Sequence, residues 1–203
     1  MAKQEAAPRL LLWVDAVGGF LVCLGEEVEL GQAVPDTTVD VPIFGDLSRR
    51  HAKIRREGEG YLIESDHRLR LDGRAAKSAG LLEDGTEIEL GDSVRLRFRK
   101  PHALSATARL DFISHHRTHP SVDAVLLMAE SCVLGPRLDN HVVCRGWSGD
   151  VVLYRQGRGL YCRATEPVEI DGALCEERGP ITHNSRISGS DFAICLEQIN
   201  NRR

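Results

Sequence analysis

The feature that most constrains the fold of this chain is a repeat of its own sequence about 100 residues apart. Gly60 and Gly159 end matching glycine turns, EGEG and QGRG, and Asp72 and Asp171 stand in matching DG turns. The two members of each pair are 99 residues apart. A period of this length is too long for a solenoid repeat and is the size of a small domain. The sequence therefore predicts two copies of one domain.

Each copy has the pattern of a β-protein. In SVRLRFRK, Val94, Leu96 and Phe98 alternate with arginines, which is the period of a half-buried strand. Turn signals recur about every 8–12 residues, a spacing typical of β-sandwiches. We therefore predict an all-β fold of two consecutive antiparallel β-sandwich domains, residues 1–103 and 104–203, which join near the segment RKPHALSATA.

Composition and charge exclude several classes of protein. With 42% hydrophobic and 28% charged residues, the chain has an ordinary globular composition. Its net charge of −4 disfavours a nucleic-acid binder, which neutralises many phosphates. No apolar run approaches the roughly 18 residues of a membrane span. The apolar stretch of MAKQEAAPRLLLWV is too short for a signal peptide, so we expect a cytoplasmic protein without nucleic-acid or membrane partners.

The six cysteines show no C-x-x-C spacing, so the usual zinc and redox motifs are missing. Most lie in apolar runs such as LVCLG and AICLE. We interpret them as small buried hydrophobic residues in a reducing compartment rather than as disulfides.

The segment DLSRRHAKI, from Asp46 to Ile54, suggests chemistry. It places Ser48 three residues before His51, with Arg49 and Arg50 between them, just ahead of an alternating strand. Three readings are open: a catalytic Ser–His pair, a phosphate-binding loop, or a turn with a structural role only.

The context of this segment resembles the forkhead-associated (FHA) domain family. The residues that carry the resemblance are Gly31, Ser48, Arg49, His51, Gly60-Tyr61, Asp72-Gly73 and the segment from Leu82 to Asp92. It covers most of the first half, about residues 9–99, and extends more weakly over the second half. It implies a β-sandwich that binds phosphothreonine peptides through loops at one end, a protein-interaction module rather than an enzyme.

The resemblance also implies roles for individual residues. Ser48, Arg49 and Arg50 would contact the phosphate, and His51 would hold the binding loop in shape. A phosphothreonine carries about −1.5 to −2 charges and three acceptor oxygens, so a hydroxyl and a guanidinium suit it. Gly31 would have a structural role beside the loop. The resemblance requires no catalytic residue, metal or cofactor, and it suggests a role in Ser/Thr kinase signalling.

The sequence departs from the family pattern at two contacts. The family has an arginine after the strand-end glycine, whereas Gly31 is followed by Gln32, which has neither a charge nor a planar fork. The family's asparagine on a later loop is absent from ESDHRLRLDG, where Arg68 is a nearby candidate.

The second copy departs from the pattern further. We match its Ser148 to the loop serine and its Val151 to the histidine, and we expect no phosphothreonine site of the usual type there.

Two alternatives to phosphothreonine recognition remain. The chain could be a phosphate-independent FHA-like scaffold in which both copies have lost the original chemistry. It could instead be an enzyme, either a hydrolase using Ser48 and His51 or a metal enzyme using His115, His116 and His119. We favour an exposed polar loop for these three histidines.

Overall fold

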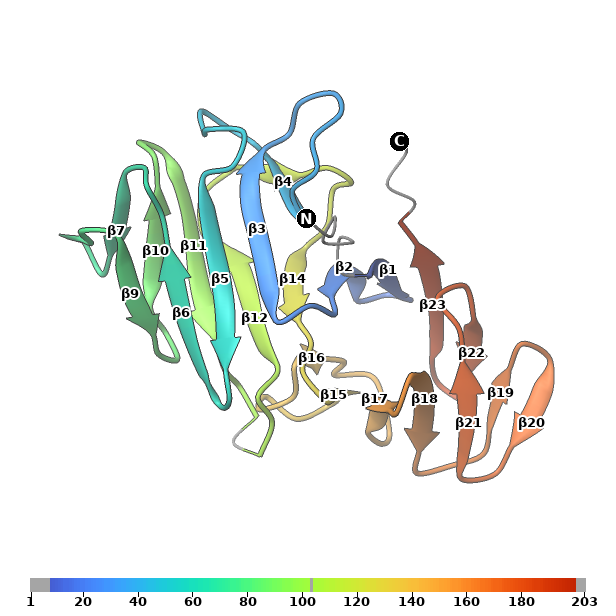
Figure 1. The fold of residues 1–203 in the computed structure, drawn as a ribbon. Helices are drawn as coiled ribbons and strands as arrows, with labels where there is room; N and C mark the ends of the chain where they lie inside the picture. Colours follow the sequence, from blue (N-terminus) through green and yellow to red (C-terminus); the bar gives the residue numbers. More distant parts are fainter. Residues whose placement is uncertain (1–7, 103, 200–203) are drawn as a thin grey trace.

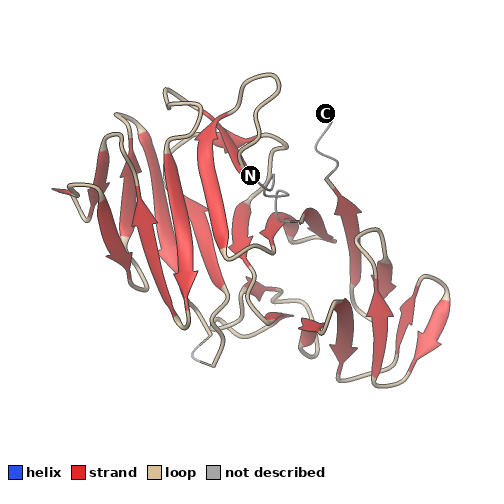
Figure 2. Cartoon of the chain, viewed as in Figure 1, coloured by secondary structure: helices blue, strands red, loops and turns tan. Residues whose placement is uncertain are grey.

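The structure, a computed structural model, describes residues 8–102 and 104–199, and every regular element in these ranges is a β-strand (Figures 1 and 2). The strands form three sheets that pack face to face, so the predicted all-β sandwich fold is confirmed. Within the described ranges there is no helix long and apolar enough to cross a membrane.

One sheet of twelve strands runs through the whole molecule. Its strands, in spatial order, are β20 (Ala173–Cys175), β19 (Val168–Ile170), β22 (Arg186–Ser188), β23 (Ala193–Gln198), β1 (Arg9–Val14), β2 (Gly18–Cys23), β14 (Ala124–Leu127), β12 (Ala108–Phe112), β11 (Val94–Arg99), β10 (Glu87–Leu90), β7 (Leu69–Leu71) and β8 (Arg74–Ala75).

Two smaller sheets cover this long sheet. The six-stranded sheet contains β13 (Arg117–Thr118), β4 (Val41–Phe44), β3 (Glu27–Gln32), β5 (Ala52–Glu57), β6 (Gly60–Glu64) and β9 (Ala79–Leu82). The five-stranded sheet contains β16 (Val142–Val143), β15 (Ser131–Gly135), β17 (Val151–Gln156), β18 (Gly159–Ala164) and β21 (Arg178–Ile181). We call the sandwich built on the six-stranded sheet the first sandwich and the one built on the five-stranded sheet the second.

The two sequence halves exchange their first strands. β1, from the first half, pairs with β2 on one side and with β23, at the C-terminal end of the second half, on the other. β12 and β14, from the second half, extend the sheet from β11 of the first half. The first sandwich is therefore completed by β12, β13 and β14 from the second half, and the second sandwich by β1 and β2 from the first half. The predicted units 1–103 and 104–203 describe the sequence repeat, and the strand pairing crosses the boundary between them.

The two halves of the long sheet meet at a parallel seam between β2 and β14. Phe20 pairs with Ala124 and Cys23 pairs with Leu127, so both pairs join residues 104 apart in the chain. Leu30 on β3 and Leu134 on β15 are separated by the same number of residues. They are counterparts in the repeat, because Leu30 pairs with the start of β5 and Leu134 pairs with the start of β17. Each residue of the seam therefore faces its own counterpart in the repeat.

Residues of the seam point alternately into two hydrophobic cores. Phe20 and Leu126 pack in the core under the five-stranded sheet, whereas Leu21 and Val125 pack in the core under the six-stranded sheet. Since successive strand residues face opposite sides of a sheet, the two smaller sheets cover opposite faces. The runs FLVC and AVLL are apolar throughout for this reason, as in a parallel sheet covered on both faces.

Removing a large side chain from the seam is expected to destabilise the protein strongly. Leu126 is fully buried, and Leu126→Ala should lower the free energy of unfolding by about 2–5 kcal/mol through lost burial and a residual cavity. Denaturant unfolding of the full chain measures this. The matched control is Leu174→Ala, since Leu174 is 73% exposed and its loss should change stability by less than about 0.5 kcal/mol. Equal effects of the two substitutions would contradict the proposed role of the seam.

Candidate functional site

The candidate site lies at one end of the first sandwich, where loops between neighbouring strands come together (upper left in Figure 1). The central loop connects β4 to β5 and contains Ser48, so we call residues 45–51 the Ser48 loop. It is flanked by the β6–β7 connection, residues 65–68, and by the β10–β11 turn, residues 91–93.

The end of β3 lies against the backbone of the Ser48 loop. A side chain at Gly31 would overlap the carbonyl oxygen of Arg49, so only glycine allows the two backbones to approach this closely. The backbone N–H of Gln32 donates to the carbonyl oxygen of Ser48 at 3.0 Å. The side-chain amide of Gln32 also donates to the carbonyl oxygen of Gly45, at 3.5 Å. Gln32 thus holds both ends of the turn that presents Ser48.

His51 lies beneath the loop and is only 5% exposed. Its Nδ1 accepts the backbone N–H of Ser48 at 3.2 Å, so Nδ1 carries no proton. Its Nε2 lies 3.1 Å from the carbonyl oxygen of Arg68 and 3.1 Å from the backbone nitrogen of Gly91, whose N–H also donates to that carbonyl oxygen at 3.0 Å. With Nδ1 unprotonated, a neutral ring donates from Nε2 to Arg68. Burial is the main cause that lowers the pKa of His51 below its usual value. The neutral ring therefore ties the Ser48 loop to the β6–β7 connection.

This arrangement does not form a nucleophile and general base. Both ring nitrogens of His51 are engaged by backbone groups, and neither is left to accept a proton from the Ser48 hydroxyl. The short S-x-x-H spacing arises because the backbone of Ser48, and not its side chain, contacts the ring.

The arginines of the site differ in whether their guanidinium groups already form ion pairs or hydrogen bonds. Arg50 forms an ion pair with Glu29 at 3.4 Å and donates to the hydroxyl of Thr38 at 3.2 Å. Arg68 pairs with Asp92. Arg49 is exposed, and its guanidinium makes no hydrogen bond or ion pair with any residue that the structure describes. The Ser48 hydroxyl, half-buried, is likewise uncommitted within the described part of the chain.

Ser65 is a structural residue of the site that sequence reasoning missed. Its hydroxyl donates to the carbonyl oxygen of His51 at 2.5 Å and accepts the N–H of His67 at 3.0 Å. This local serine turn fixes the β6–β7 connection in the absence of an asparagine. The available signal was the run S-D-H directly after a buried strand, which is typical of such a turn.

The second sandwich does not repeat this site, and its sequence alignment needs a correction of one residue. Leu134 pairs with Val151 as Leu30 pairs with Ala52, so Val151 corresponds to Ala52 and not to His51. By this register, Asp150, directly before β17, stands in the place of His51, directly before β5. The loop is shorter in the second sandwich, because Val142 pairs with Leu134 as Val41 pairs with Leu30, so the register assigns no counterpart to Ser48.

The residues of this shorter loop have their own packing. Trp147 is buried against Phe192, with ring centroids 4.7 Å apart. Asp150 accepts a hydrogen bond from the side-chain amide of Asn140 at 2.8 Å. A carboxylate thus stands where the first sandwich has the His51 imidazole, and the shortened loop before it holds a buried aromatic side chain.

The histidines of the segment 114–119 do not converge on a common point. The Nδ1 of His116 lies 2.9 Å from the Ser114 hydroxyl, and its Nε2 lies 3.2 Å from the Ser93 hydroxyl. Among the residues that the structure describes, no group of three or more His, Cys, Asp or Glu side chains is placed to hold a metal. The six cysteines are free thiols. Burial raises the pKa of Cys132, Cys144 and Cys162 to about 12.

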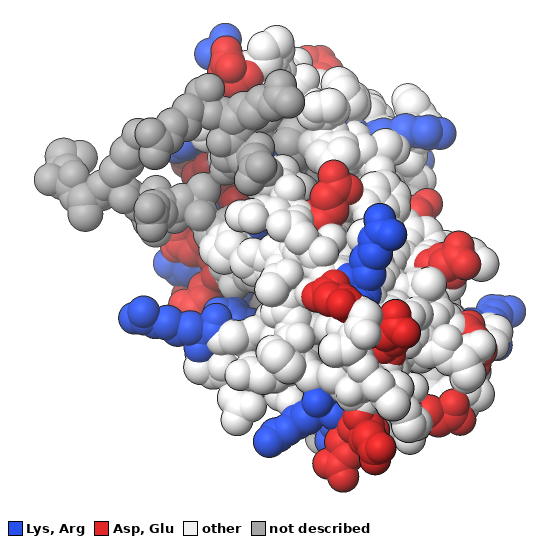
Figure 3. Space-filling view, turned by 90° about the vertical axis from the view of Figure 1, so that its right-hand side faces the viewer, with Lys and Arg blue, Asp and Glu red and all other residues white. Residues whose placement is uncertain are grey.

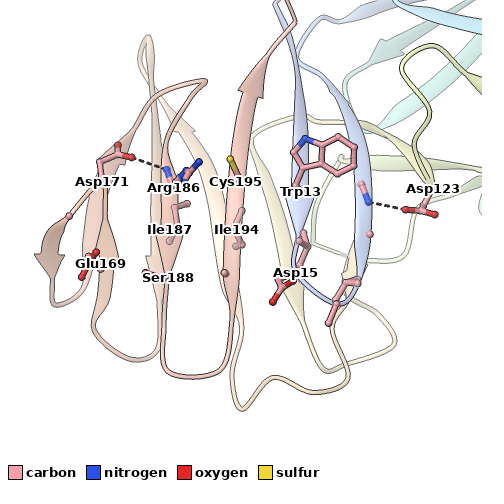
Figure 4. A pocket seen from close by; sticks show the side chains of 17 residues that line it. Trp13, Asp15, Asp123, Glu169, Asp171, Arg186, Ile187, Ser188, Ile194 and Cys195 are labelled. Carbon is pink, nitrogen blue, oxygen red and sulfur yellow. Dashed lines mark hydrogen bonds between the residues drawn. The ribbon is translucent and has the colours of Figure 1, made fainter.

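A second concave feature is an open groove of about 900 Å³ on the outer face of β19, β22, β23 and β1 (Figure 4). Trp13 forms one wall, and its indole N–H donates to Glu197 at 3.1 Å. At the opposite wall, Asp171 accepts the backbone N–H of Arg186 and the hydroxyl of Ser185, which lowers the pKa of Asp171. These hydrogen bonds stabilise the sheet and its turn, and the groove was not anticipated from the sequence.

The surface charge is mixed on the face shown in Figure 3, where Lys and Arg side chains are interspersed with Asp and Glu among uncharged residues. A nucleic-acid backbone requires a continuous basic surface, which this face does not offer.

Comparisons with known proteins give partial matches. No protein-family model matches the chain, and no curated protein matches it. Among solved structures, the FHA domain of the CT664 protein from Chlamydia trachomatis is 27% identical, with 41% of this chain and 89% of that chain covered and a TM-score of 0.31. The FHA domain of an Arabidopsis thaliana hypothetical protein is 20% identical, with 45% and 85% covered and a TM-score of 0.31.

A third match spans nearly the whole chain. The N-terminal FHA domain from EssC, a component of the bacterial Type VII secretion apparatus, is 10% identical, with 94% of this chain and 98% of that chain covered and a TM-score of 0.25. At these TM-scores the likenesses carry no argument, so the description of the fold rests on the strand pairing of this chain.

The neutral state of His51 predicts a pH-dependent contribution to stability. His51→Gln should lower the free energy of unfolding by about 1–3 kcal/mol at pH 8, because the backbone N–H of Ser48 loses its acceptor. Since the folded-state pKa is depressed, this contribution is present above the unfolded value of about 6.5 and is lost as pH falls below it. The difference from wild type, measured by denaturant unfolding, should therefore shrink between pH 8 and pH 5.

The matched control is His183→Gln on the β21–β22 turn, a residue for which the described structure has no hydrogen bond. It should change stability little at either pH. A His51→Gln difference that is constant or grows toward pH 5 would contradict the assigned tautomer.

Proposed function

We propose that this protein is a protein-interaction module whose first sandwich recognises phosphothreonine peptides through the Ser48 loop. The observation that carries the proposal is the construction of this loop. Gly31 and His51 fix its backbone from below, while the Ser48 hydroxyl and the Arg49 guanidinium are left without partners among the described residues. The two groups that the FHA resemblance assigns to the phosphate are thus the two uncommitted groups of a rigid loop.

The chemistry of these groups suits a phosphate dianion. A hydroxyl donates one hydrogen bond, and a guanidinium donates two in a planar fork, which gives charge-assisted bonds. A preformed loop loses little conformational entropy when the ligand binds. Ser48 and Arg49 would therefore provide the main contacts, with Gln32 lining the site as a neutral donor.

The remaining predicted contacts are weaker candidates. Arg50 is paired with Glu29, and Arg68 is paired with Asp92, so each would first have to leave a carboxylate. The arginine and the asparagine of the family pattern are absent. Since a hydrogen bond to a charged group contributes roughly 1.5–3 kcal/mol, each missing contact weakens binding by about 10- to 100-fold. We expect a transient interaction, as suits a reader in Ser/Thr kinase signalling.

The rest of the proposal follows from the same reading. The protein would act as a binding module and not as an enzyme, without a metal or a cofactor. The partner would be a phosphorylated protein and not a nucleic acid or a membrane. Free and mostly buried cysteines are in keeping with a reducing, cytoplasmic location.

A phosphate-independent scaffold is the second candidate. It is favoured by the second sandwich, where Asp150 stands at the position of His51 and the loop before β17 is shorter. A carboxylate at this place would repel a phosphate, so this sandwich supports binding of a different kind or a purely structural role.

The test is a titration of the full chain with a degenerate phosphothreonine peptide pool and with its unphosphorylated twin. We expect saturable binding that requires the phosphate and weakens at least tenfold in Ser48→Ala and in Arg49→Ala. The matched control is Arg158→Ala, since Arg158 is an exposed arginine on the β17–β18 turn of the second sandwich.

Each outcome has a defined meaning. Equal binding of the two pools, or equal weakening by Arg158→Ala and Arg49→Ala, would overturn phosphothreonine recognition at the Ser48 loop. Binding of both pools with unchanged affinity in Ser48→Ala would support the phosphate-independent scaffold.

A further inference from the structure

The strand exchange carries a segment of the second sequence half to the candidate site of the first half. Between β12 and β14 the chain forms β13, which joins the edge of the six-stranded sheet beside β4. Arg117 pairs with Phe44, and Thr118 pairs with Ile43. The backbone N–H of His119 donates to the carbonyl oxygen of Pro42 at 2.9 Å. The segment 114–119 is therefore a built part of the first sandwich.

This segment directly contacts the elements of the site. His116 directly precedes β13 in the chain. A Cβ atom at Gly45, directly after β4, would lie 3.1 Å from the His116 ring. The same ring lies against the hydroxyl of Ser93 on the β10–β11 turn. Gly45 in turn accepts the side-chain amide of Gln32. A continuous path of contacts thus joins His116 through Gly45 and Gln32 to the Ser48 loop.

The outer face of this segment exposes an aromatic and cationic surface. Phe44 is 54% exposed, although the other three residues of β4 are buried. His119 packs edge-on against it, with ring centroids 5.7 Å apart. Arg117 is exposed and forms no ion pair with any residue that the structure describes. We call Phe44, Arg117 and His119 the β13 patch.

The buried residue of the segment holds this patch in place. Thr118 is fully buried, its hydroxyl donates to the carbonyl oxygen of Pro120 at 2.6 Å, and it accepts the N–H of Val122 at 3.2 Å. A rigid strand therefore presents an uncompensated guanidinium and an exposed ring next to the candidate phosphate loop.

We propose that the β13 patch is the second part of the peptide site and that it selects acidic residues flanking the phosphothreonine. This inference rests on the proposed function of the Ser48 loop. Arg117 would pair with a carboxylate of the peptide, and Phe44 with His119 would contact the apolar part of a neighbouring side chain. The second half of the chain would thus determine the sequence preference of a site whose phosphate contacts come from the first half.

The experiment compares two phosphothreonine peptide pools on the full chain. One pool has Asp or Glu at the flanking positions, the other has Asn or Gln, and each has an unphosphorylated twin. An exposed ion pair contributes modestly, so we expect the wild type to prefer the acidic phosphorylated pool by roughly three- to fivefold. Arg117→Gln should remove this preference by lowering the affinity for the acidic phosphorylated pool to that for the neutral phosphorylated pool.

The matched control is Arg158→Gln, which removes the same charge from the far turn and should keep the preference. An equal thermal unfolding midpoint of the two variants shows that folding is intact. Phosphate-dependent binding with no acidic preference, or with a preference that survives in Arg117→Gln, would overturn this inference and leave the proposed function standing. Absence of phosphate-dependent binding to either pool would overturn both.

Discussion

The parallel pairing of β2 with β14 is the constraint on which the rest of the structure depends. It joins two halves of one sheet, and its side chains enter both hydrophobic cores. Since neither face of these strands reaches water, a polar residue on either face would lie unsatisfied in a core. The seam also depends on the strand exchange, because β2 carries β1 to β23 of the second half. One continuous sheet therefore joins the two sandwiches.

This continuous sheet changes what the repeat means for function. A tandem repeat ordinarily gives two sites, each built from its own copy. Here the second copy has a carboxylate in place of the His51 imidazole, yet it contributes β12, β13 and β14 to the first sandwich. The segment from Ser114 to His119 thereby lies beside Gly45 and the end of β3. A segment that the sequence indicates as an exposed polar loop thus lies beside the candidate site.

The site shows why glycine and histidine carry so much of the sequence signal. Gly31 is required by a backbone contact with Arg49, and His51 is required by two backbone hydrogen bonds. Neither Gly31 nor His51 is expected to touch a ligand. Both position Ser48 and Arg49, which are proposed to contact it. The departures from the FHA sequence pattern fall instead at Gln32 and in the β6–β7 connection, where ligand contacts are proposed. Substitution at such positions changes affinity without disturbing the fold, so a chain can retain the loop while its chemistry changes.

The sequence by itself determined the β-structure, the repeat and the Ser48 loop. Alternation in SVRLRFRK, matched DG turns and the S-x-x-H spacing depend on neighbours within a few residues, and such local preferences are readable from one chain. Only the tertiary structure decided which strands complete which sandwich, that Asp150 takes the place of His51, and that Arg117 lies beside the first site. The reason is that the edge of β11 can form the same backbone hydrogen bonds with a strand from either half of the chain. The choice depends on packing across both faces of the β2–β14 seam, a long-range property that no local pattern records.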